Sequence, residues 1–364
     1  MIYLDYQATT PLAPEALAAM LPWLERQHAN PHSAHPAGRA ARAAVEVARE
    51  QVAALLPRGG TLSFTSGATE ALNWAIKGVG PGRIVTIATE HAAVLDTIEA
   101  LRHGGRDVVL LPVDAEGMID LQIAGRVIEP GTALVAAMLV NNEIGVIQPI
   151  AALADIAHSA GAMLLCDAVQ GYGRVAIPDT VDMIAISAHK IYGPKGIGAL
   201  WLRDGITINA LMHGGGQETA GRSGTLSPAL CAGFGAAAQL MAERKAQDDA
   251  LIGQYWQAAM QILGNRWTVN GSTDQRYRGN INIRRDGIDV ARLMSDCRDI
   301  AFSAGSACAS GSGRTSHVLE AMGLTIDEAK SSIRLGFGRY TTKEELVTAL
   351  NRIDAAARSQ ELVP

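Results

Sequence analysis

A lysine and an aspartate that each follow an apolar run carry the clearest chemical signal in the sequence. Lys190 lies in the segment SAHKIYGPKG, and Asp167 lies a short crossover upstream. A lysine amine can condense with the aldehyde of pyridoxal phosphate, and an aspartate can keep the pyridine nitrogen of that cofactor protonated, so that the ring accepts electrons. Surface lysines and strand-end aspartates are also common without such a role, so the pair gains its meaning from its neighbours.

Further polar residues follow apolar runs in the same way. His91 and Asn142 each come after such a run, and Gln170 lies just beyond Asp167. Because ligands of open α/β sheets bind beyond the carboxyl ends of the strands, we expect these side chains to meet in one crevice. An imidazole there could stack on a pyridine ring or move protons, and the amides could bind the ring's phenolic oxygen or a substrate. A structural histidine and ordinary turn residues are the alternatives.

Two glycine-containing segments could hold a phosphate. The segment SGATE at residues 66–70 joins a predicted strand to a predicted helix, where free N–H groups favour anions and glycine permits close approach. An ordinary helix cap is the alternative. The second segment, HGGGQ at residues 213–217 with RSGT at 222–225, could equally be a plain surface loop.

One of the four cysteines differs from the others. Cys166, Cys231 and Cys297 have apolar or helical neighbours and are predicted to be inert core thiols. Cys308 lies in SAGSACASGSG, a segment without bulky residues, so it is a candidate nucleophile, with a simple linker as the alternative. The spacing predicts neither a zinc site nor a disulfide framework, and it favours a reducing cytoplasm.

Composition limits the class of protein. The chain has 364 residues, 48% hydrophobic and 18% charged, with a net charge of −5, which indicates a globular protein of about two domains. The acidic balance argues against nucleic acid as a partner. No apolar run is long enough to span a membrane, and the N-terminus lacks the basic and apolar regions of a signal peptide. We therefore expect a cytoplasmic protein.

Strands and helices alternate between about residues 60 and 205, and most predicted strands are continuous apolar runs, which favours a mostly parallel α/β sheet. An alanine-rich buried helix is expected at 229–242. Beyond about residue 245 the pattern predicts a smaller α+β domain with a separate helix at 251–263, strands at 278–284 and 332–335, and a helix at 343–358.

Several motifs then combine: YLDYQATTP at 3–11, FTSGATE at 64–70, TEH at 89–91, VNNEIG at 140–145, RSGT at 222–225, SAC at 306–308 and SSIR at 331–334, together with the Asp167 and Lys190 segments. In this combination the chain resembles, nearly end to end, the class V aminotransferase-like cysteine desulfurases of the NifS/IscS type. The resemblance implies fold type I of the pyridoxal-phosphate-dependent transferases. It also implies a large domain at 15–245 and a small domain formed by 1–14 with 246–364, which carries the Cys308 loop.

The resemblance also implies roles for individual residues. Lys190 would hold pyridoxal phosphate and later move the Cα proton, Asp167 would pair with the ring nitrogen, Gln170 with the phenolic oxygen, and His91 would stack on the ring. The phosphate would be bound by Ala68, Thr69, Ser187, Ala188 and His189, with Thr225 from the other subunit of a homodimer.

Asn142, beside the cofactor, and Arg334 would hold the substrate L-cysteine, Arg334 by a bidentate grip on its carboxylate. Cys308 would take the sulfur as a persulfide while L-alanine leaves. It would then pass the sulfur to an acceptor protein for iron–sulfur cluster or thio-cofactor synthesis. No intrinsic metal is implied, although Cys308 could be a transient iron–sulfur ligand.

Some positions depart from the family pattern. Thr315 stands where proline is common, Ala188 replaces a frequent glycine, and residues 335–338 differ after the arginine. The chain ends at Pro364, soon after its last predicted helix, so docking of an iron–sulfur scaffold protein is an open question.

Three alternatives accompany the desulfurase: a selenocysteine lyase, another class V enzyme such as an aminotransferase, and a non-catalytic homologue that binds sulfur carriers. Cys308 argues against an aminotransferase, which needs no thiol. Lys190, Asp167 and Cys308 together argue against the non-catalytic homologue. The sequence does not name the sulfur acceptor.

Overall fold

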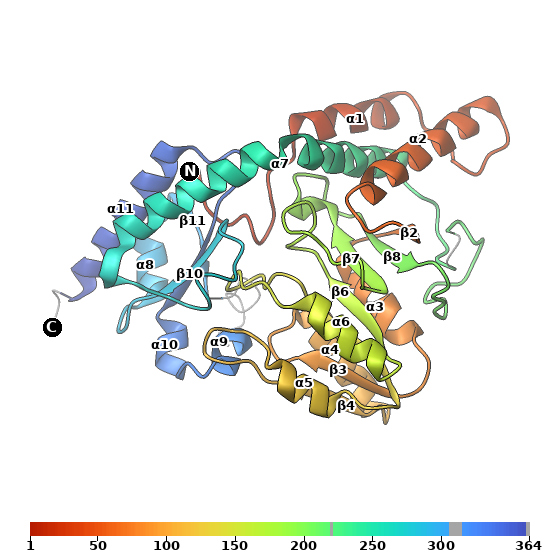
Figure 1. Ribbon diagram of the computed structural model, residues 1–364. Helices are drawn as coiled ribbons and strands as arrows, with labels where there is room; N and C mark the ends of the chain where they lie inside the picture. Colours follow the sequence, from red (N-terminus) through yellow and green to blue (C-terminus); the bar gives the residue numbers. More distant parts are fainter. Residues whose placement is uncertain (219–220, 306–314, 362–364) are drawn as a thin grey trace.

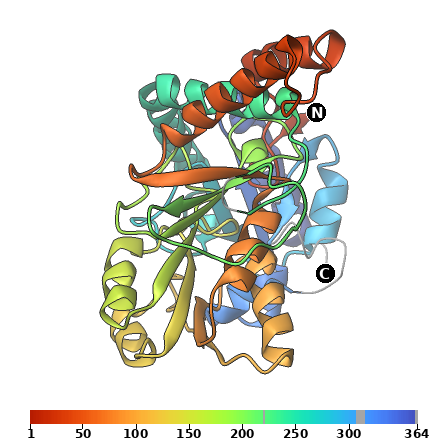
Figure 2. The ribbon, with the colours of Figure 1, turned by 90° about the vertical axis from the view of Figure 1, so that its right-hand side faces the viewer.

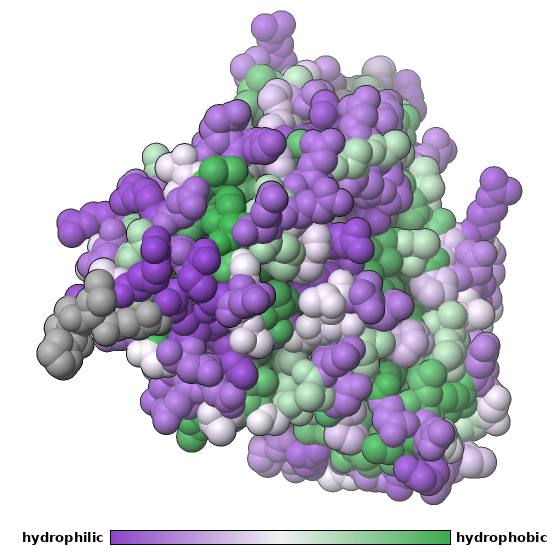
Figure 3. All heavy atoms as spheres, turned by 60° about the vertical axis from the view of Figure 1, so that its left-hand side comes forward, coloured by the Kyte–Doolittle hydropathy of each residue, from purple (hydrophilic) through white to green (hydrophobic). Residues whose placement is uncertain are grey.

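The computed structural model describes residues 1–218, 221–305 and 315–361 (Figure 1). The predicted nucleophile Cys308 therefore lies outside the described residues. Within the described part, no helix combines the length and the apolar character that crossing a membrane requires. Hydrophilic residues cover much of the face in Figure 3, and apolar residues form smaller areas between them.

A seven-stranded sheet forms the centre of the larger part, in the order β2-β8-β7-β6-β5-β3-β4. Strands β7, β6, β5, β3 and β4 run parallel to one another, whereas β8 is antiparallel to both β2 and β7. The predicted α/β fold with a mostly parallel sheet is thus confirmed. The strands are β2 (Gly60–Thr65), β3 (Arg83–Ile87), β4 (Val108–Leu111), β5 (Thr132–Met138), β6 (Met163–Asp167), β7 (Met183–Ser187) and β8 (Gly198–Arg203).

Helices cover both faces of this sheet (Figures 1 and 2). Side chains alternate between the faces: Ile84 belongs to the apolar cluster that includes Trp74 of α3, and Val85 belongs to the cluster that includes Phe234 of α7. A strand in a sheet with helices on both faces buries the side chains that point to either face, which explains its continuous apolar sequence. The helices of this part are α1 (Pro14–Glu25), α2 (Pro36–Ala53), α3 (Ala68–Gly78), α4 (Ala92–His103), α5 (Leu121–Val127), α6 (Ile150–Ser159) and α7 (Pro228–Leu263).

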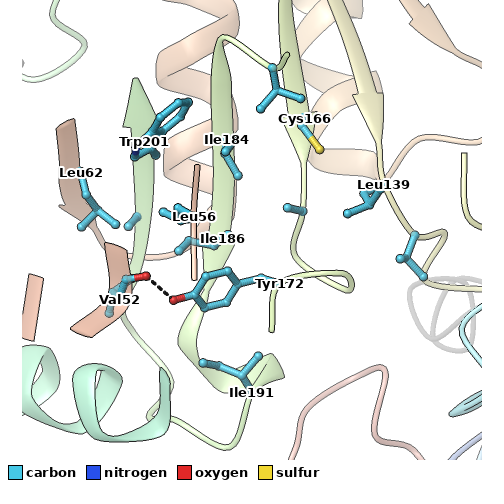
Figure 4. Packing of buried hydrophobic residues seen from close by; sticks show 14 of the residues in the cluster. Val52, Leu56, Leu62, Leu139, Cys166, Tyr172, Ile184, Ile186, Ile191 and Trp201 are labelled. Carbon is cyan, nitrogen blue, oxygen red and sulfur yellow. Dashed lines mark hydrogen bonds between the residues drawn. The ribbon is translucent and has the colours of Figure 1, made fainter. Parts of the chain in front are cut away.

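The core on the α7 side includes few polar groups, and each needs a partner. Figure 4 shows Tyr172 among apolar side chains that include Ile186 and Ile191. Its hydroxyl donates a hydrogen bond of 2.6 Å to the carbonyl oxygen of Val52. This bond satisfies a fully buried phenol and ties the strand layer to α2.

The smaller part contains a four-stranded sheet, β12-β13-β10-β9, and the parallel pair β1-β11. Its apolar cluster joins Leu4 near the N-terminus to Trp256, Leu293 and Leu346. Leu4 therefore packs with the small part, whereas Tyr6 and Ala13 belong to the apolar cluster of the large part, and the predicted division at residue 14 stays a prediction. The elements are β1 (Ile2–Tyr3), β9 (Thr268–Val269), β10 (Asn280–Arg284), α8 (Val290–Asp296), β11 (Ile300–Ala301), β12 (Ser303–Ala304), α9 (His317–Ala321), α10 (Ile326–Lys330), β13 (Ser332–Gly336) and α11 (Lys343–Glu361).

One continuous helix links the two parts, and this differs from the sequence-based expectation of two separate helices. Helix α7 has 36 residues and extends from the large sheet to the small sheet (Figure 1). Phe234 in its first half packs in the large core, and Trp256 in its second half packs in the small core. The mostly polar residues 243–250 between them are, apart from Asp248 and Asp249, good helix formers, so the apolar pattern is interrupted while the helix continues.

Candidate active site

A cavity of about 590 Å³ lies at the carboxyl ends of β5, β6 and β7. Most of the predicted site residues line it, as the topology of the sheet requires. Of the predicted residues, Ala188 is buried and Thr225 is exposed, and neither lines the cavity. The predicted residues that line it are Ala68, Thr69, His91, Asn142, Asp167, Gln170, Ser187, His189, Lys190 and Arg334.

Lys190 reaches the cavity from the short helical turn Ala188–Lys190, which follows β7 directly. Its Nζ atom donates hydrogen bonds to the backbone carbonyls of Gln7, at 2.5 Å, and Ala8, at 2.9 Å. Burial, with the charges of Arg334 and Arg174, lowers the pKa of Lys190 to about 8. A neutral amine, which is the nucleophilic form, is therefore accessible near neutral pH.

The turn after Lys190 is held in a strained conformation. Tyr192 has a φ of 69°, in the left-handed region that a bulky residue seldom adopts. Its N–H donates to Thr10 Oγ1 at 2.7 Å, and its hydroxyl accepts from the N–H of Arg339 at 3.0 Å. Both ends of Tyr192 are therefore fixed, which is how a strained residue persists next to a functional side chain.

Asp167 ends β6 and is buried at the bottom of the cavity. Its Oδ1 accepts a hydrogen bond of 3.0 Å from the N–H of Val169. Burial raises the pKa of Asp167 to about 6, and the Val169 hydrogen bond and the Lys190 charge oppose that rise. A cationic ring nitrogen beside Asp167 would supply the missing counter-charge, so the carboxylate suits a pyridinium.

A second carboxyl, that of Glu90, lies behind Asp167. Glu90 is fully buried, and its Oε1 accepts a 2.6 Å hydrogen bond from the N–H of Met138. Burial and the nearby Asp167 charge raise the pKa of Glu90 well above its ordinary value. Burial and the neighbouring charge thus both disfavour the ionised form of Glu90.

His91 occupies the N-cap position of α4. Its Nδ1 accepts a hydrogen bond of 3.1 Å from the N–H of Ala93, so in the neutral ring the proton is on Nε2. Burial, with the charges of Lys190 and His317, lowers the pKa of His91. The cavity is thus lined by a neutral imidazole whose Nε2–H is a donor.

Gln170 presents an amide with unused hydrogen-bonding capacity. Its Nε2 donates to the carbonyl of Gln7 at 2.9 Å, which leaves the second Nε2 hydrogen. Its Oε1 is buried and, among residues 1–218, 221–305 and 315–361, has no partner. Such an orphaned amide in the wall of a cavity suits a ligand with a phenolic oxygen.

The end of the cavity beside the first turn of α3 depends on a close approach between two chain segments. A Cβ on Gly198 would lie 2.5 Å from the carbonyl oxygen of Ile186 and 2.7 Å from the carbonyl carbon of Gly67. Glycine is therefore required at position 198 for the segment before α3 to lie against the sheet. Helix α3 begins at Ala68 without a side-chain cap, so its first N–H groups are available to an anion.

Arg334 approaches the cavity from β13 in the smaller part. Its side chain is only 1% exposed. Nη2 donates to Asp5 Oδ1 at 2.8 Å, and Nη1 donates to the carbonyl of Asn142 at 3.1 Å. The guanidinium is therefore fixed in direction before any substrate arrives, as a carboxylate grip requires.

Both described flanks of the segment 306–314 are attached to one residue, Glu143. Asn282 Nδ2 donates to the carbonyl of Gly305 at 3.3 Å and to that of Glu143 at 3.2 Å. Beyond the segment, the Ser316 hydroxyl donates to the Glu143 carboxylate. Since Glu143 follows Asn142 directly, both flanks are attached beside the part of the cavity that Asn142 lines.

Sequence reasoning missed several contributors to this site. Gln7 and Ala8 act through backbone carbonyls, which have no sequence signature. The motif YLDYQATTP, which contains both residues, is the one signal in the sequence that points to this segment. The additional lining residues include Gln7, Ala8, Ser66, Val169 and Lys195.

Comparison with known proteins agrees with this geometry. The model of the family described as aminotransferase class-V matches residues 2–348. The chain is 41% identical to "Cysteine desulfurase IscS" of Rickettsia bellii (strain OSU 85-389), over 97% of this chain and 90% of that protein.

Solved structures are similar as well. A NifS-like protein from Rickettsia africae ESF-5 has a TM-score of 0.90 at 30% identity, covering 98% of this chain and 99% of that chain. SspA in complex with cysteine has a TM-score of 0.83 at 34% identity, covering 94% and 100%. These matches confirm the predicted resemblance, and the chain belongs to the aminotransferase class-V family.

Proposed function

We propose that this chain is a pyridoxal-phosphate-dependent cysteine desulfurase, which converts L-cysteine to L-alanine and retains the sulfur as a persulfide on Cys308. One observation carries the proposal: a single cavity combines a lysine of lowered pKa, a buried aspartate and a pre-oriented arginine. Near full-length similarity to proteins named cysteine desulfurase supports the same reaction.

The cavity suits the cofactor from end to end. Bound pyridoxal phosphate supplies an electron sink that labilises bonds at the substrate's Cα and Cβ. We assign the aldehyde end to Lys190, the ring nitrogen to Asp167 and the phenolic oxygen to Gln170. His91 is assigned to the ring face. The phosphate is assigned to Ala68, Thr69, Ser187, Ala188 and His189.

The protein's own groups then orient the substrate and move its proton. Arg334 and Asn142 hold the L-cysteine carboxylate and fix the Cα–H bond toward Lys190. Lys190 in its neutral form accepts the Cα proton and later returns it, because its lowered pKa makes both protonation states accessible. The neutral His91, a donor through Nε2, is placed to hydrogen-bond the substrate.

The sulfur step uses the thiolate of Cys308. That thiolate attacks the substrate sulfur, an S–S bond forms, and the substrate's Cβ–S bond breaks with its electron pair left on the carbon side. Protonation of Cβ gives L-alanine, and Cys308 keeps one additional sulfur atom. Two equivalents of an external thiol then release sulfide and regenerate the Cys308 thiol.

We further propose that the enzyme is a cytoplasmic homodimer that delivers sulfur to an acceptor protein. Thr225 is exposed and does not line the cavity of its own chain, which supports a role at the phosphate site of a second subunit. The segment before it is held by Arg222 bonded to Glu70 at 2.8 Å and Arg49 bonded to Glu218 at 2.7 Å. Two such largely shielded ion pairs would present Thr225 in a fixed position.

The cofactor assignment has a direct test. The purified protein should have a visible absorption band, and borohydride should attach the cofactor to Lys190 in a peptide map. With L-cysteine and dithiothreitol it should form alanine and sulfide in equal amounts. A protein that takes up no added pyridoxal phosphate, or that forms pyruvate instead of alanine, would overturn the proposal.

The dimer has a separate test. Lys190→Ala and Thr225→Ala protein should each be impaired alone, and mixing them should restore part of the activity. In a hybrid dimer one site combines an intact Lys190 with an intact Thr225 from the other chain. A fully active monomer in light scattering would exclude this arrangement.

A further inference from the structure

Arg334, which we assign to the substrate carboxylate, is already paired with a carboxylate of the protein, that of Asp5. Asp5, in the N-terminal segment, accepts from Arg334 Nη2 at 2.8 Å and from the Ser303 hydroxyl at 2.9 Å, both through Oδ1. The Asp5 side chain is 19% exposed and that of Arg334 is 1% exposed. The ion pair is therefore largely shielded from water, and its charges interact strongly.

Arg334 keeps donors that this pair does not use. A guanidinium has five N–H groups. Asp5 and the carbonyl of Asn142 each accept a hydrogen bond from one of these groups, and Nη2 also donates to the Ser303 hydroxyl at 3.4 Å. Nε is buried and has no partner within the described ranges. A substrate carboxylate can therefore bind Arg334 while Asp5 remains bound, and the two anions then share one cation.

We propose that Asp5 is a positioning residue that sets the affinity of the site for amino-acid carboxylates. It directs the guanidinium, and its negative charge offsets part of the attraction that a buried arginine would otherwise exert. The inference rests on the proposed function, because L-cysteine and L-alanine have the same carboxylate. Arg334 therefore binds the carboxylates of substrate and product equally strongly. Because Asp5 weakens this interaction, L-alanine dissociates more readily after the reaction.

The surroundings support an electrostatic role for Asp5 beyond a purely structural one. Its own backbone is held independently of its carboxylate: the residue bridges to Gly336, and its carbonyl accepts from the Tyr3 hydroxyl at 3.2 Å. Two residues further on, the Gln7 carbonyl accepts from Lys190 and Gln170. Neutralising the side chain therefore leaves the segment anchored and changes chiefly the charge beside Arg334.

The test is Asp5→Asn in the holoenzyme. Asparagine has nearly the same shape, and its Oδ1 can still accept from Arg334 and Ser303, so the charge is what is lost. We expect the dissociation constant for L-alanine, from titration of the visible band, to fall about tenfold. The KM for L-cysteine should fall with it, and L-alanine should become a stronger inhibitor.

Asp248→Asn is the matched control. Asp248 pairs with Arg339 at 2.6 Å, with exposures of 13% and 2%, and neither residue lines the active-site cavity. This variant should lose stability and keep the L-alanine affinity of the wild type. A structural effect of neutralising any Arg–Asp pair would change both variants alike, and that result would overturn the inference.

A wild-type measurement keeps the inference testable if Asp5→Asn does not fold. Asp5 offsets part of the charge of Arg334, so the charge of the ligand should matter only moderately. The dissociation constant of L-alaninamide, whose carboxamide has no charge, should therefore be less than about a hundred times that of L-alanine. A larger preference would contradict the offset, as would unchanged or weaker L-alanine binding by a folded Asp5→Asn protein. Wild-type protein that forms no alanine from L-cysteine would instead reject the proposed function, so the two failures are distinguishable.

Discussion

The Nδ1 atom of His91 accepts a hydrogen bond from the backbone N–H of Ala93, 3.1 Å away, in the first turn of α4. A backbone N–H cannot accept a proton, so protonation of Nδ1 would break this cap. The helix terminus therefore helps to keep His91 neutral, in addition to burial and the nearby Lys190 and His317 charges.

The first prediction is the protonation state of His91. Nitrogen-15 NMR of histidine-labelled protein should show a neutral ring protonated at Nε2, with a pKa below the ordinary value of 6.5. Ala93→Pro removes the N–H donor at the second position of the helix and should relax this tautomer preference. A cationic His91 at pH 7 in the wild type would contradict the assignment.

The second prediction concerns stability against acid. Burial, with the Lys190 and Lys195 charges, lowers the pKa of His189 from 6.5 to about 4. Between these values the unfolded chain binds the proton and the folded chain does not, so protons favour unfolding. The contribution is fully present above pH 6.5 and is lost as the pH falls toward 4.

The urea midpoint measured at successive pH values tests this window. The wild-type midpoint should fall between pH 6.5 and 4, and His189→Asn, which cannot titrate, should show a shallower fall. Parallel curves for the two proteins would mean that His189 is not the group responsible.

The third prediction concerns the approach of β8 to the segment before α3. Gly198→Ala places a Cβ within 2.5 Å of the Ile186 carbonyl oxygen and should lower the free energy of unfolding by about 3 kcal/mol. It should also weaken uptake of pyridoxal phosphate, because the clash includes Gly67. Gly125→Ala in α5, where an added Cβ meets nothing within 4 Å, is the control. Normal cofactor uptake by Gly198→Ala would argue against a phosphate site at this contact.

The fourth prediction concerns the flanks of the Cys308 segment. Ser316→Ala removes the N-cap of α9 and the hydrogen bond to Glu143, and Thr325→Ala removes only the N-cap of α10. Each should lose about 1 kcal/mol of stability as an N-cap variant. Only Ser316→Ala should slow sulfide formation, by about tenfold, because the flank that positions Cys308 is released. Equal rates would show that the Glu143 attachment does not affect the chemistry.

The sequence predicted the sheet and most of the cavity because both depend on local patterns. Apolar strand cores followed by polar residues located His91, Asn142, Asp167 and Lys190, and the sheet brings them together. Contacts that depend on backbone atoms left no such pattern. The Gln7 carbonyl that receives Lys190 lies 183 residues away in the chain, and nothing in its residue type indicates that pairing.

Helix α7 was predicted as two separate helices for a different physical reason. Apolar periodicity reports which core a segment packs against, and α7 packs against two cores with a solvated stretch at 243–250 between them. A periodic pattern that stops and restarts is typical of two helices, but helix propensity carries the chain through. Asp5 likewise lies within the motif YLDYQATTP, and its pairing with Arg334 depends on the tertiary structure.

The central claim is that Cys308 takes sulfur from L-cysteine in a cavity built around Lys190, and a single-turnover experiment tests it most directly. Holoenzyme mixed with one equivalent of L-cysteine per active site, and with no other thiol or reductant, should release one alanine per active site. Mass spectrometry should then find one additional sulfur atom on the peptide that contains Cys308. Cys308→Ala should keep the visible band and the borohydride attachment at Lys190, and it should release almost no alanine. Stoichiometric alanine from Cys308→Ala, or sulfur retained on Cys166, Cys231 or Cys297 in the wild type, would contradict the account.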